Sequence, residues 1–311
     1  MILCCGEALI DFMPRETRKG TLAFEPLSGG SVFNTAVALG RLGVPVKFFG
    51  GLSRDFFGDQ LRAALTASHV DFSLSPLSDR PTIAAFVKIE NGQARYSFVD
   101  EGSACRMIAI ADLPILGPAT KAIHLGSFPL IGEPSGTTLE TLCAREHSRR
   151  VINFDPNIRP GLVKDRTAYL GRIARMVAMA DIIKLSDEDL NWITQGATAD
   201  EFAARALAEG AKAVVMTLGP DGAQAYTKQY RCQVPGRAVK VADTVGAGDT
   251  FSAGFLAALA RANRLTKDAV ASLDEPTLRS ALMLAISAAA ITVSRPGADP
   301  PWAHELEGVF S

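Results

Sequence analysis

The chain has 311 residues, of which 48% are hydrophobic, enough for two average domains or for one large α/β domain with an insertion. Its formal net charge is −1 and its lysines and arginines are scattered, which excludes the electrostatic footprint of a nucleic-acid-binding protein. The five cysteines show no Cys-x-x-Cys spacing and the four histidines are isolated, so we expect reduced thiols and no metal cluster.

Neither the N-terminus nor the longest apolar run predicts a membrane segment. Residues 1–7 have no basic start and no long apolar stretch, so they do not form a signal peptide. The run Ala281–Val293 is too short to span a bilayer and is predicted to be a core helix. We therefore expect a cytoplasmic protein with no membrane partner.

The first part of the chain predicts strands and helices in alternation. Ile2–Cys5 forms a strand, and Glu7–Phe12 is expected to continue it or to pair beside it. Asp11 points away from its neighbours Ile10 and Phe12, as a surface residue or as a ligand. The other elements expected here are a loop with a short strand over 15–27, a helix over 31–42 capped by Ser31, a strand over 46–50 and a helix over 58–69.

A hairpin then interrupts the alternation. Residues 82–89 and 94–99 alternate as strands, and Asn91-Gly92 between them is a strong hairpin signal. Because no helix intervenes, this hairpin does not belong to a βαβ series. We interpret 82–103 as an inserted β flap that shares its sheet with residues 12–27.

From residue 121 onward the alternation resumes, which predicts a doubly wound, mostly parallel sheet between two helix layers in one domain over 1–311. The strands expected are 122–125, 150–154, 181–185 and 213–217, with a hairpin over 223–226 and 231–234. The helices expected are 134–147, 167–179, 186–194, 202–209 and 252–262, besides the core helix.

Two polar loops follow predicted strands at the edge where open α/β sheets bind ligands. Asp155-Pro156-Asn157-Ile158-Arg159 carries an arginine that either clamps a charged ligand or fixes the loop. Ser186-Asp187-Glu188-Asp189 is fully explained by helix capping and by acids in a first turn.

The stretch Asp243-Thr244-Val245-Gly246-Ala247-Gly248-Asp249-Thr250-Phe251 precedes an Ala-rich helix. Its two glycines allow a tight turn, and amides of Gly246, Ala247 and Gly248 at the helix N-terminus would bind an anion such as phosphate. Asp249 is either a helix cap or a general base for an attacking hydroxyl. A Rossmann fingerprint would need glycine at Phe251, and no P-loop motif occurs anywhere in the sequence.

That nine-residue stretch resembles the C-terminal signature of the ribokinase-like, or phosphofructokinase B, family of sugar kinases. Ser28-Gly29-Gly30-Ser31-Val32-Phe33-Asn34-Thr35-Ala36 resembles the N-terminal signature of the same family. The two stand in the expected order, and the resemblance covers essentially the whole chain. It implies a three-layer α/β/α sandwich with a small β lid over the sugar site, sometimes used as a homodimer contact.

The resemblance also implies roles for individual residues. Sugar-binding residues would be Asp11, Gly29, Gly30, Asn34, Phe98 and Arg159. Thr217, Gly219 and Gly222 would border the ATP cleft, together with Gly248. Backbone carbonyls near Asp243, Val245, Arg295 and Gly297 would hold a monovalent cation, with potassium as the candidate. Many relatives carry Asn-x-x-Glu where this chain has Ser186 and Asp189, so the binding of Mg²⁺ is left open.

The resulting hypothesis is ATP-dependent phosphorylation of a sugar, with Asp249 as base, the Gly246–Gly248 amides holding the phosphoryl group, and Mg²⁺ on the phosphates. Gly-Glu-x-Leu-Ile-Asp and Asp-Pro-Asn-x-Arg resemble fructokinases most, which predicts fructose 6-phosphate as product. The alternative acceptor is 2-keto-3-deoxygluconate, whose carboxylate would need Arg159 or Arg95. A third alternative is a catalytically silent sugar- or nucleotide-sensing protein.

Overall fold

The computed structural model describes residues 1–90 and 93–309, without the side chains of 89, 90, 93–95 and 309. A nine-stranded sheet forms the middle layer, parallel except at β14 and β15. From one edge to the other its strands are β15 (Arg231–Val234), β14 (Ala223–Tyr226), β13 (Ala213–Thr217), β12 (Ile182–Ser186), β11 (Val151–Asp155), β10 (Ala122–Gly126), β1 (Ile2–Cys5), β4 (Val46–Phe49) and β6 (Val70–Asp71).

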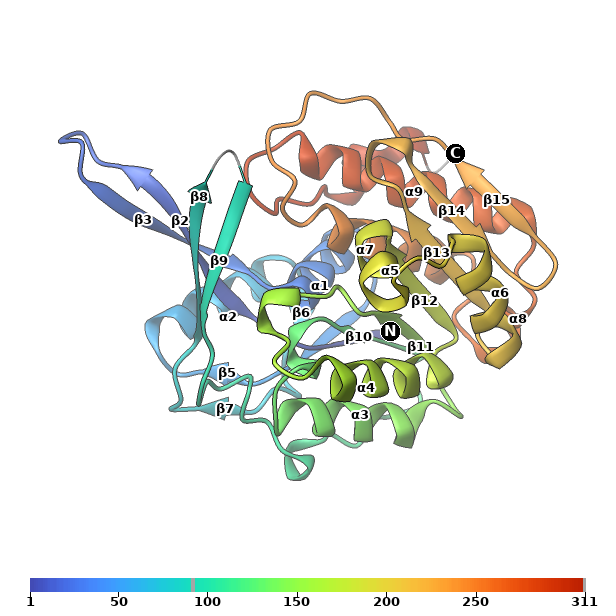
Figure 1. The fold of residues 1–311 in the computed structure, drawn as a ribbon, viewed down its shortest axis with the longest axis horizontal. Coiled ribbons are helices and arrows are strands. Elements are labelled where there is room, and N and C mark those ends of the chain that lie inside the picture. Colours follow the sequence, from blue (N-terminus) through green and yellow to red (C-terminus); the bar gives the residue numbers. More distant parts are fainter. Residues whose placement is uncertain (91–92, 310–311) are drawn as a thin grey trace.

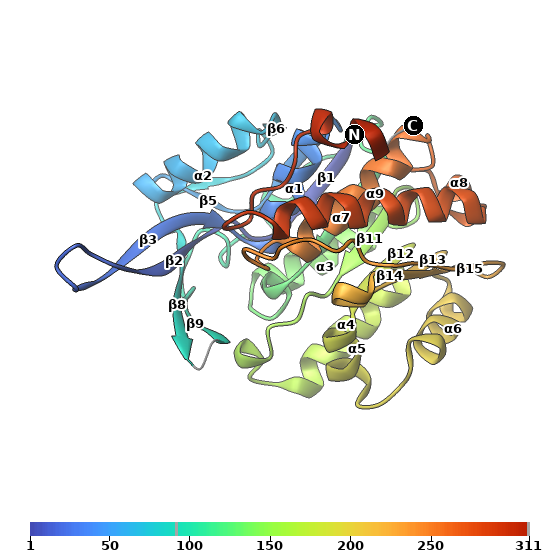
Figure 2. The same ribbon diagram turned by 90° about the horizontal axis from the view of Figure 1, so that it is seen from above.

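Helices cover both faces of this sheet (Figure 2). One face carries α1 (Ser31–Arg41), α2 (Phe56–Ala67), α7 (Ala247–Arg261), α8 (Lys267–Ala271) and α9 (Glu275–Val293). The other carries α3 (Ser135–Glu146), α4 (Arg166–Met179), α5 (Asp187–Thr194) and α6 (Ala199–Glu209). The side chains of successive strand residues point to opposite faces of the sheet. In β1, Ile2 and Cys4 pack in the core under α1 and α7, whereas Leu3 and Cys5 pack in the core under α3 and α4. The predicted three-layer α/β/α fold is confirmed.

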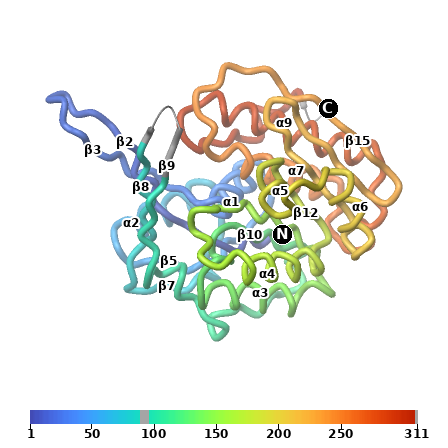
Figure 3. The backbone as a smooth tube through the Cα atoms, viewed as in Figure 1, coloured from blue at the N-terminus to red at the C-terminus, as the bar shows by residue number. Residues whose placement is uncertain are grey.

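A separate four-stranded sheet in the order β3-β2-β8-β9 stands beside the main body (Figures 1 and 3). We call this sheet the lid sheet; its strands are β2 (Leu9–Glu16), β3 (Leu22–Gly29), β8 (Ile83–Glu90) and β9 (Gln93–Val99). The predicted hairpin over 82–99 is present as β8 and β9, and its Asn91-Gly92 turn lies outside the described residues. A further pair, β5 (Leu52–Ser53) and β7 (Leu77–Ser78), is parallel.

One prediction about the N-terminal region was wrong. Glu7–Phe12 neither continues nor pairs with β1, because the chain turns at Gly6 and β2 joins β3 and β8 in the lid sheet. The loop and strand expected over 15–27 are present as residues 17–21 and β3, and the sheet expected to join this region to 82–103 is the lid sheet. Most side chains of this projecting hairpin are at least partly exposed, so the period-two pattern that reveals a strand is weak there.

The C-terminal helices are longer than predicted. The helix expected from 252 begins at Ala247, so the glycine turn forms its first turn. The predicted core segment Ala281–Val293 is the second part of α9, which has 19 residues and is long and apolar enough, by length and composition alone, to cross a membrane. It packs instead on α7, where a Cβ at Gly254 would lie 2.7 Å from Cα of Ala285. Its role is therefore that of a core helix.

Short 3₁₀ helices complete the described chain: η1 (Ile110–Asp112), η2 (Phe128–Leu130), η3 (Pro160–Leu162), η4 (Gly219–Asp221) and η5 (Ala303–Val309). All five cysteines, which lie within the described residues, are free and buried.

Candidate active site

A cleft of about 610 Å³ lies where the lid sheet, α1, the loop after β11 and the start of α7 meet. Among the predicted site residues it is lined by Asp11, Gly30, Asn34, Phe98, Arg159, Val245, Gly246, Ala247, Gly248 and Asp249. Gly29 is adjacent to it, since a Cβ there would lie 2.2 Å from Oδ2 of Asp11. The fold thus brings together residues that are more than 200 positions apart in the sequence.

Asp249 is the third residue of α7 and is not its cap. Its carboxylate is 6% exposed and lines the cleft. Oδ1 accepts a hydrogen bond of 2.7 Å from the Ser31 hydroxyl, and Oδ2 one of 2.9 Å from Nδ2 of Asn34. Burial raises the pKa of Asp249 above its ordinary value, against the lowering effect of these two donors. The result is an oriented carboxylate with increased basicity.

The turn before α7 has unpaired donors. Gly246 adopts the left-handed conformation, with φ 77°, which a residue with a Cβ rarely takes. The amide of Ala247 donates to the carbonyl of Thr244 at 3.3 Å, whereas the described residues offer no acceptor to the amides of Gly246 and Gly248. With the helix dipole behind them, the amides of Gly246 and Gly248 are available to an anion, whereas the amide of Ala247 is already paired.

The other end of the cleft carries Asp11 on β2 and the aromatic ring of Phe98 on β9. Burial raises the pKa of Asp11 to about 6, an effect that the nearby Arg159 guanidinium partly offsets. Phe98 packs 5.6 Å from the ring of Phe128 and 5.8 Å from that of Tyr96, so it contributes both to the cleft wall and to packing within the lid.

Arg159 contacts its own loop and also lines the cleft. Its Nη1 donates to Oδ1 of Asn157 at 2.6 Å, which fixes the loop, and the side chain also lines the cleft. Asn157, at φ 36°, in turn donates from Nδ2 to Oγ of Ser31 at 2.6 Å. A polar chain therefore links Arg159 to the hydroxyl that holds Asp249.

Several residues that line the cleft were not predicted as site residues; they are Glu7, Ser31, Asn157 and Lys184. Burial raises the pKa of Glu7 to about 7, and its Oε1 accepts a hydrogen bond of 2.6 Å from the Ser31 amide. Lys184 carries the clearest signal in retrospect, because a charged residue inside the buried parallel strand Ile182–Ser186 is unusual. Ser31 was predicted as a helix cap, which is wrong: Gly30 precedes the helix and the Ser31 hydroxyl bonds to Asp249.

Thr217, Gly219 and Gly222 lie outside the cleft lining, at and after the carboxyl end of β13. Thr217 donates from Oγ1 to the carbonyl of Leu185 at 3.3 Å. Gly222 has φ 97°, and a Cβ there would lie 2.1 Å from the carbonyl oxygen of Val234, so packing alone requires glycine.

Asp243 ties together the two loops predicted to hold a monovalent cation. Its carboxylate accepts hydrogen bonds from the amide of Val245 at 3.0 Å and from that of Gly297 at 2.9 Å. Arg295 forms an ion pair with Glu305.

Asp189 completes a capping box with Ser186 and accepts a hydrogen bond of 2.8 Å from the amide of Ile158. These two side chains thus have structural partners. No group of three His, Cys, Asp or Glu side chains suited to a metal occurs in the described part of the chain.

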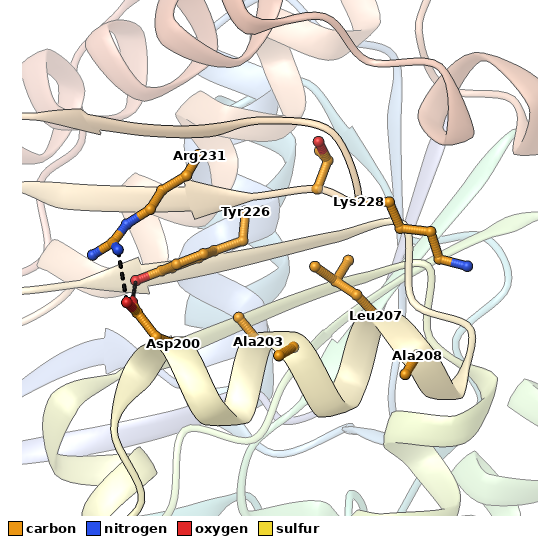
Figure 4. A pocket seen from close by; sticks show the side chains of 9 residues that line it. Asp200, Ala203, Leu207, Ala208, Tyr226, Lys228 and Arg231 are labelled. Carbon is orange, nitrogen blue, oxygen red and sulfur yellow. Dashed lines mark hydrogen bonds and ion pairs between the residues drawn. The ribbon is translucent and has the colours of Figure 1, made fainter.

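A second cavity, of about 590 Å³, lies between α6 and the β14–β15 hairpin (Figure 4). The carboxylate of Asp200 in this cavity accepts hydrogen bonds from Tyr226 at 2.8 Å and from Arg231 at 2.7 Å. It shares no lining residue with the cleft among those described, and nothing in it indicates a ligand.

A doubly wound sheet with an anion-binding turn beside a buried carboxylate defines an α/β phosphotransferase that acts on an alcohol. Comparison with known proteins agrees. The chain belongs to the pfkB family of carbohydrate kinases, whose family model matches residues 1–305. This confirms the predicted family.

Among its relatives, a fructokinase of Rhizobium leguminosarum bv. trifolii is 54% identical over 280 residues, which cover 90% of this chain and 86% of that protein. The fructokinase of Xylella fastidiosa with bound ATP superposes with a TM-score of 0.90 at 27% identity, covering 99% of this chain and 97% of the other. A double mutant of the Vibrio cholerae O395 fructokinase, in a form with fructose, ADP and a potassium ion bound, gives a TM-score of 0.83 at 28% identity, with 96% and 93% covered.

Proposed function

We propose that this carbohydrate kinase transfers the γ-phosphoryl group of ATP to the 6-hydroxyl of fructose. The observation that carries the proposal is that Asp249 lines one cleft together with the Gly246–Gly248 turn, Asp11 and Asn34, and accepts a hydrogen bond from Asn34. The relatives reported for this chain are fructokinases, and their similarity extends over nearly its whole length.

In this proposal Asp11 accepts hydrogen bonds from sugar hydroxyls, and Gly29 and Gly30 let the sugar approach the backbone. Asn34 orients Asp249, to which it donates directly, and so assists the sugar site indirectly. Asp249 takes the proton of the 6-hydroxyl as that oxygen attacks the γ-phosphorus. The amides of Gly246 and Gly248 stabilise the charge on the transferred phosphoryl oxygens. Phe98 and the lid sheet exclude water, which would otherwise compete as acceptor.

In this proposal the nucleotide lies beside Thr217, Gly219 and Gly222, at the carboxyl end of β13. That end lies next to the carboxyl end of β12, and Lys184 of β12 lines the cleft. Magnesium is normally held by one or two carboxylates together with substrate phosphates. A cleft lined by Glu188 and Asp249, without a three-carboxylate cluster among the described residues, fits that mode. When bound, the ion neutralises phosphate charge.

A potassium ion is proposed at the carbonyls near Asp243, Val245, Arg295 and Gly297. The support is the hydrogen bond from the Gly297 amide to Asp243, which joins the two loops, while Asp243 also accepts from Val245 within its own loop. The Vibrio cholerae relative carries potassium in one solved form. Replacing potassium with tetramethylammonium should lower kcat; an unchanged rate would reject the site.

The acceptor is tested by initial rates with ATP and a panel of fructose, 2-keto-3-deoxygluconate, ribose and glucose. We expect the highest kcat/KM with fructose, and activity confined to the keto acid would reject that choice. Arg159 lines the cleft and could pair with a carboxylate, while the Arg95 side chain is outside the described residues. Sugar-dependent release of ADP would exclude the alternative of a catalytically silent sensing protein. Binding of sugar and ATP without release of ADP would support that alternative.

Two further features belong to the proposal. The lid sheet exposes apolar side chains, which are Leu22, Phe24, Phe86, Tyr96 and Val99. We place a homodimer contact there, and Phe24→Ser should shift the sedimentation coefficient from dimer toward monomer. A cytoplasmic location is proposed because all five cysteines, within the described residues, are free and buried.

A further inference from the structure

Lys184 is a buried cation in the middle of the sheet. It is the third residue of β12, between Ile183 and Leu185, and only 6% of its surface is exposed. Its side chain points to the face covered by α7, and it is the only lysine lining the cleft among the described residues. Burying an ammonium group is costly unless it is paired, so its position calls for an explanation.

The protein supplies Lys184 with one partner. Its Nζ lies 3.0 Å from Oδ2 of Asp155, at the carboxyl end of the neighbouring strand β11. The same Oδ2 also accepts a hydrogen bond of 3.2 Å from the Ser252 hydroxyl on α7. An ammonium group has three donors, so two donors of Lys184 are without an acceptor among the described residues. The pair holds the cation in place and leaves part of its hydrogen-bonding capacity for a ligand.

The free donors lie beside the anion turn. A Cβ at Gly248 would lie 3.2 Å from Nζ of Lys184, so the ammonium group sits directly against the backbone whose amide is unpaired. Burial lowers the pKa of Lys184, and the surrounding carboxylates Asp155, Asp189 and Asp249 outweigh that effect and raise it. The side chain therefore stays charged at the point where the negative phosphoryl group would bind.

We propose that Lys184 is a catalytic residue that donates hydrogen bonds to the γ-phosphoryl oxygens during transfer, with Asp155 as its positioning residue. The inference rests on the proposed function of the same cleft. As the bond from the sugar 6-oxygen to the γ-phosphorus forms, the bond from that phosphorus to the β,γ-bridging oxygen breaks. The hydroxyl proton goes to Asp249 and ADP leaves with the electron pair. The ammonium charge of Lys184 and the Gly248 amide stabilise the three equatorial oxygens through this step.

The test uses Lys184→Met, which keeps length and removes charge, in the full-length protein. We expect kcat with fructose to fall by about 100- to 1,000-fold, as for loss of one preorganised donor. Calorimetry should show binding of the non-hydrolysable ATP analogue AMP-PNP weakened at least about tenfold, with ADP weakened less than about threefold. A merely structural lysine would not change this discrimination between the two nucleotides. Equal loss for both nucleotides, or kcat within about tenfold of the wild type, would overturn the proposal.

Lys184→Met leaves the buried Asp155 carboxylate without its cation, which lowers stability. The double variant Lys184→Met, Asp155→Asn removes both charges and should fold while showing the same kinetic loss; recovery of wild-type kcat in it would also overturn the proposal. The matched control is Lys267→Met. Lys267 also forms an ion pair with a buried aspartate, Asp181 at 2.7 Å, but Asp181 immediately precedes β12, at the amino end of the strand. That variant should lose stability and keep both kcat and the discrimination between nucleotides. The two proposals can fail separately. If the wild-type protein does not phosphorylate fructose, the proposed function is refuted. The role of Lys184 is still tested by whether Lys184→Met binds AMP-PNP and ADP with a changed ratio of affinities.

Discussion

Replacing Asp249 by asparagine separates its chemistry from its packing. The carboxylate accepts from Ser31 at 2.7 Å and from Asn34 at 2.9 Å, and an asparagine amide of nearly the same shape keeps one of these acceptors. If the bond from Asn34 is kept, the other position becomes an amide nitrogen that faces the Nδ2 donor of Asn157, 3.4 Å from Oδ1. Such a conflict costs about 1–3 kcal/mol in folding stability.

The effect on the reaction is separate. A general base contributes about 100- to 10,000-fold, and at 1.36 kcal/mol per decade this raises the barrier by about 2.7–5.4 kcal/mol. Since Asp11 and the lid are untouched, fructose affinity should change less than about threefold. The predicted signature of Asp249→Asn is thus a large loss of kcat with nearly constant sugar binding.

The assay couples ADP formation to NADH oxidation, with fructose binding measured by calorimetry and stability by urea unfolding. Asp11→Asn is the comparison variant, because we expect it to raise the KM for fructose with a smaller effect on kcat. If Asp249→Asn retained kcat within about tenfold of the wild type, the assignment of the base would be wrong. A loss of fructose affinity in proportion to the loss of rate would instead point to a binding role.

Two further predictions concern the sugar end of the cleft. Gly29→Ala places a Cβ 2.2 Å from Oδ2 of Asp11, so the carboxylate must move; the KM for fructose should rise at least about tenfold with little change in kcat, and an unchanged KM would contradict the role of Asp11. The second prediction concerns Glu7, whose pKa rises from 4.5 in the unfolded chain to about 7 in the folded protein. Protonated Glu7 therefore stabilises the wild-type fold, and this contribution is lost as the pH rises from 4.5 to about 7. Glu7→Gln keeps an acceptor for the Ser31 amide and does not titrate, so its stability relative to the wild type should increase by up to about 3 kcal/mol between pH 5 and 8 in urea unfolding; parallel pH profiles would contradict it.

The alternating part of the fold could be predicted from the sequence because its signals are local. Short apolar runs such as Ile2–Cys5 and Ala213–Thr217 are strands buried on both faces, and each is confirmed within a residue or two. The lid sheet was predicted in part, since 12–27 and 82–103 were expected to share a sheet, but the pairing of β2 with β8, more than 70 positions away, leaves no local pattern that shows where β2 begins. Glu7–Phe12 was therefore placed in the wrong sheet.

The same distinction applies to the site. Residues carried by the two signatures, such as Asn34 and Asp249, were identified and lie together in the cleft. Ser31 and Asn157 were missed because their function is to hold Asp249 and each other, a relation between three separate loops and helices. A capping serine and a hydroxyl that orients a carboxylate are identical in sequence and differ only in tertiary structure.

The hydrogen bonds that orient Asp249 also weaken it as a base. Donors such as Ser31 and Asn34 favour the charged carboxylate and lower its pKa, so a solvated carboxylate held in this way would accept a proton poorly. Burial at the start of α7 has the opposite effect and is the larger of the two. Orientation and basicity are therefore compatible only where the carboxylate is buried, as Asp249 is beside α1 and the loop after β11.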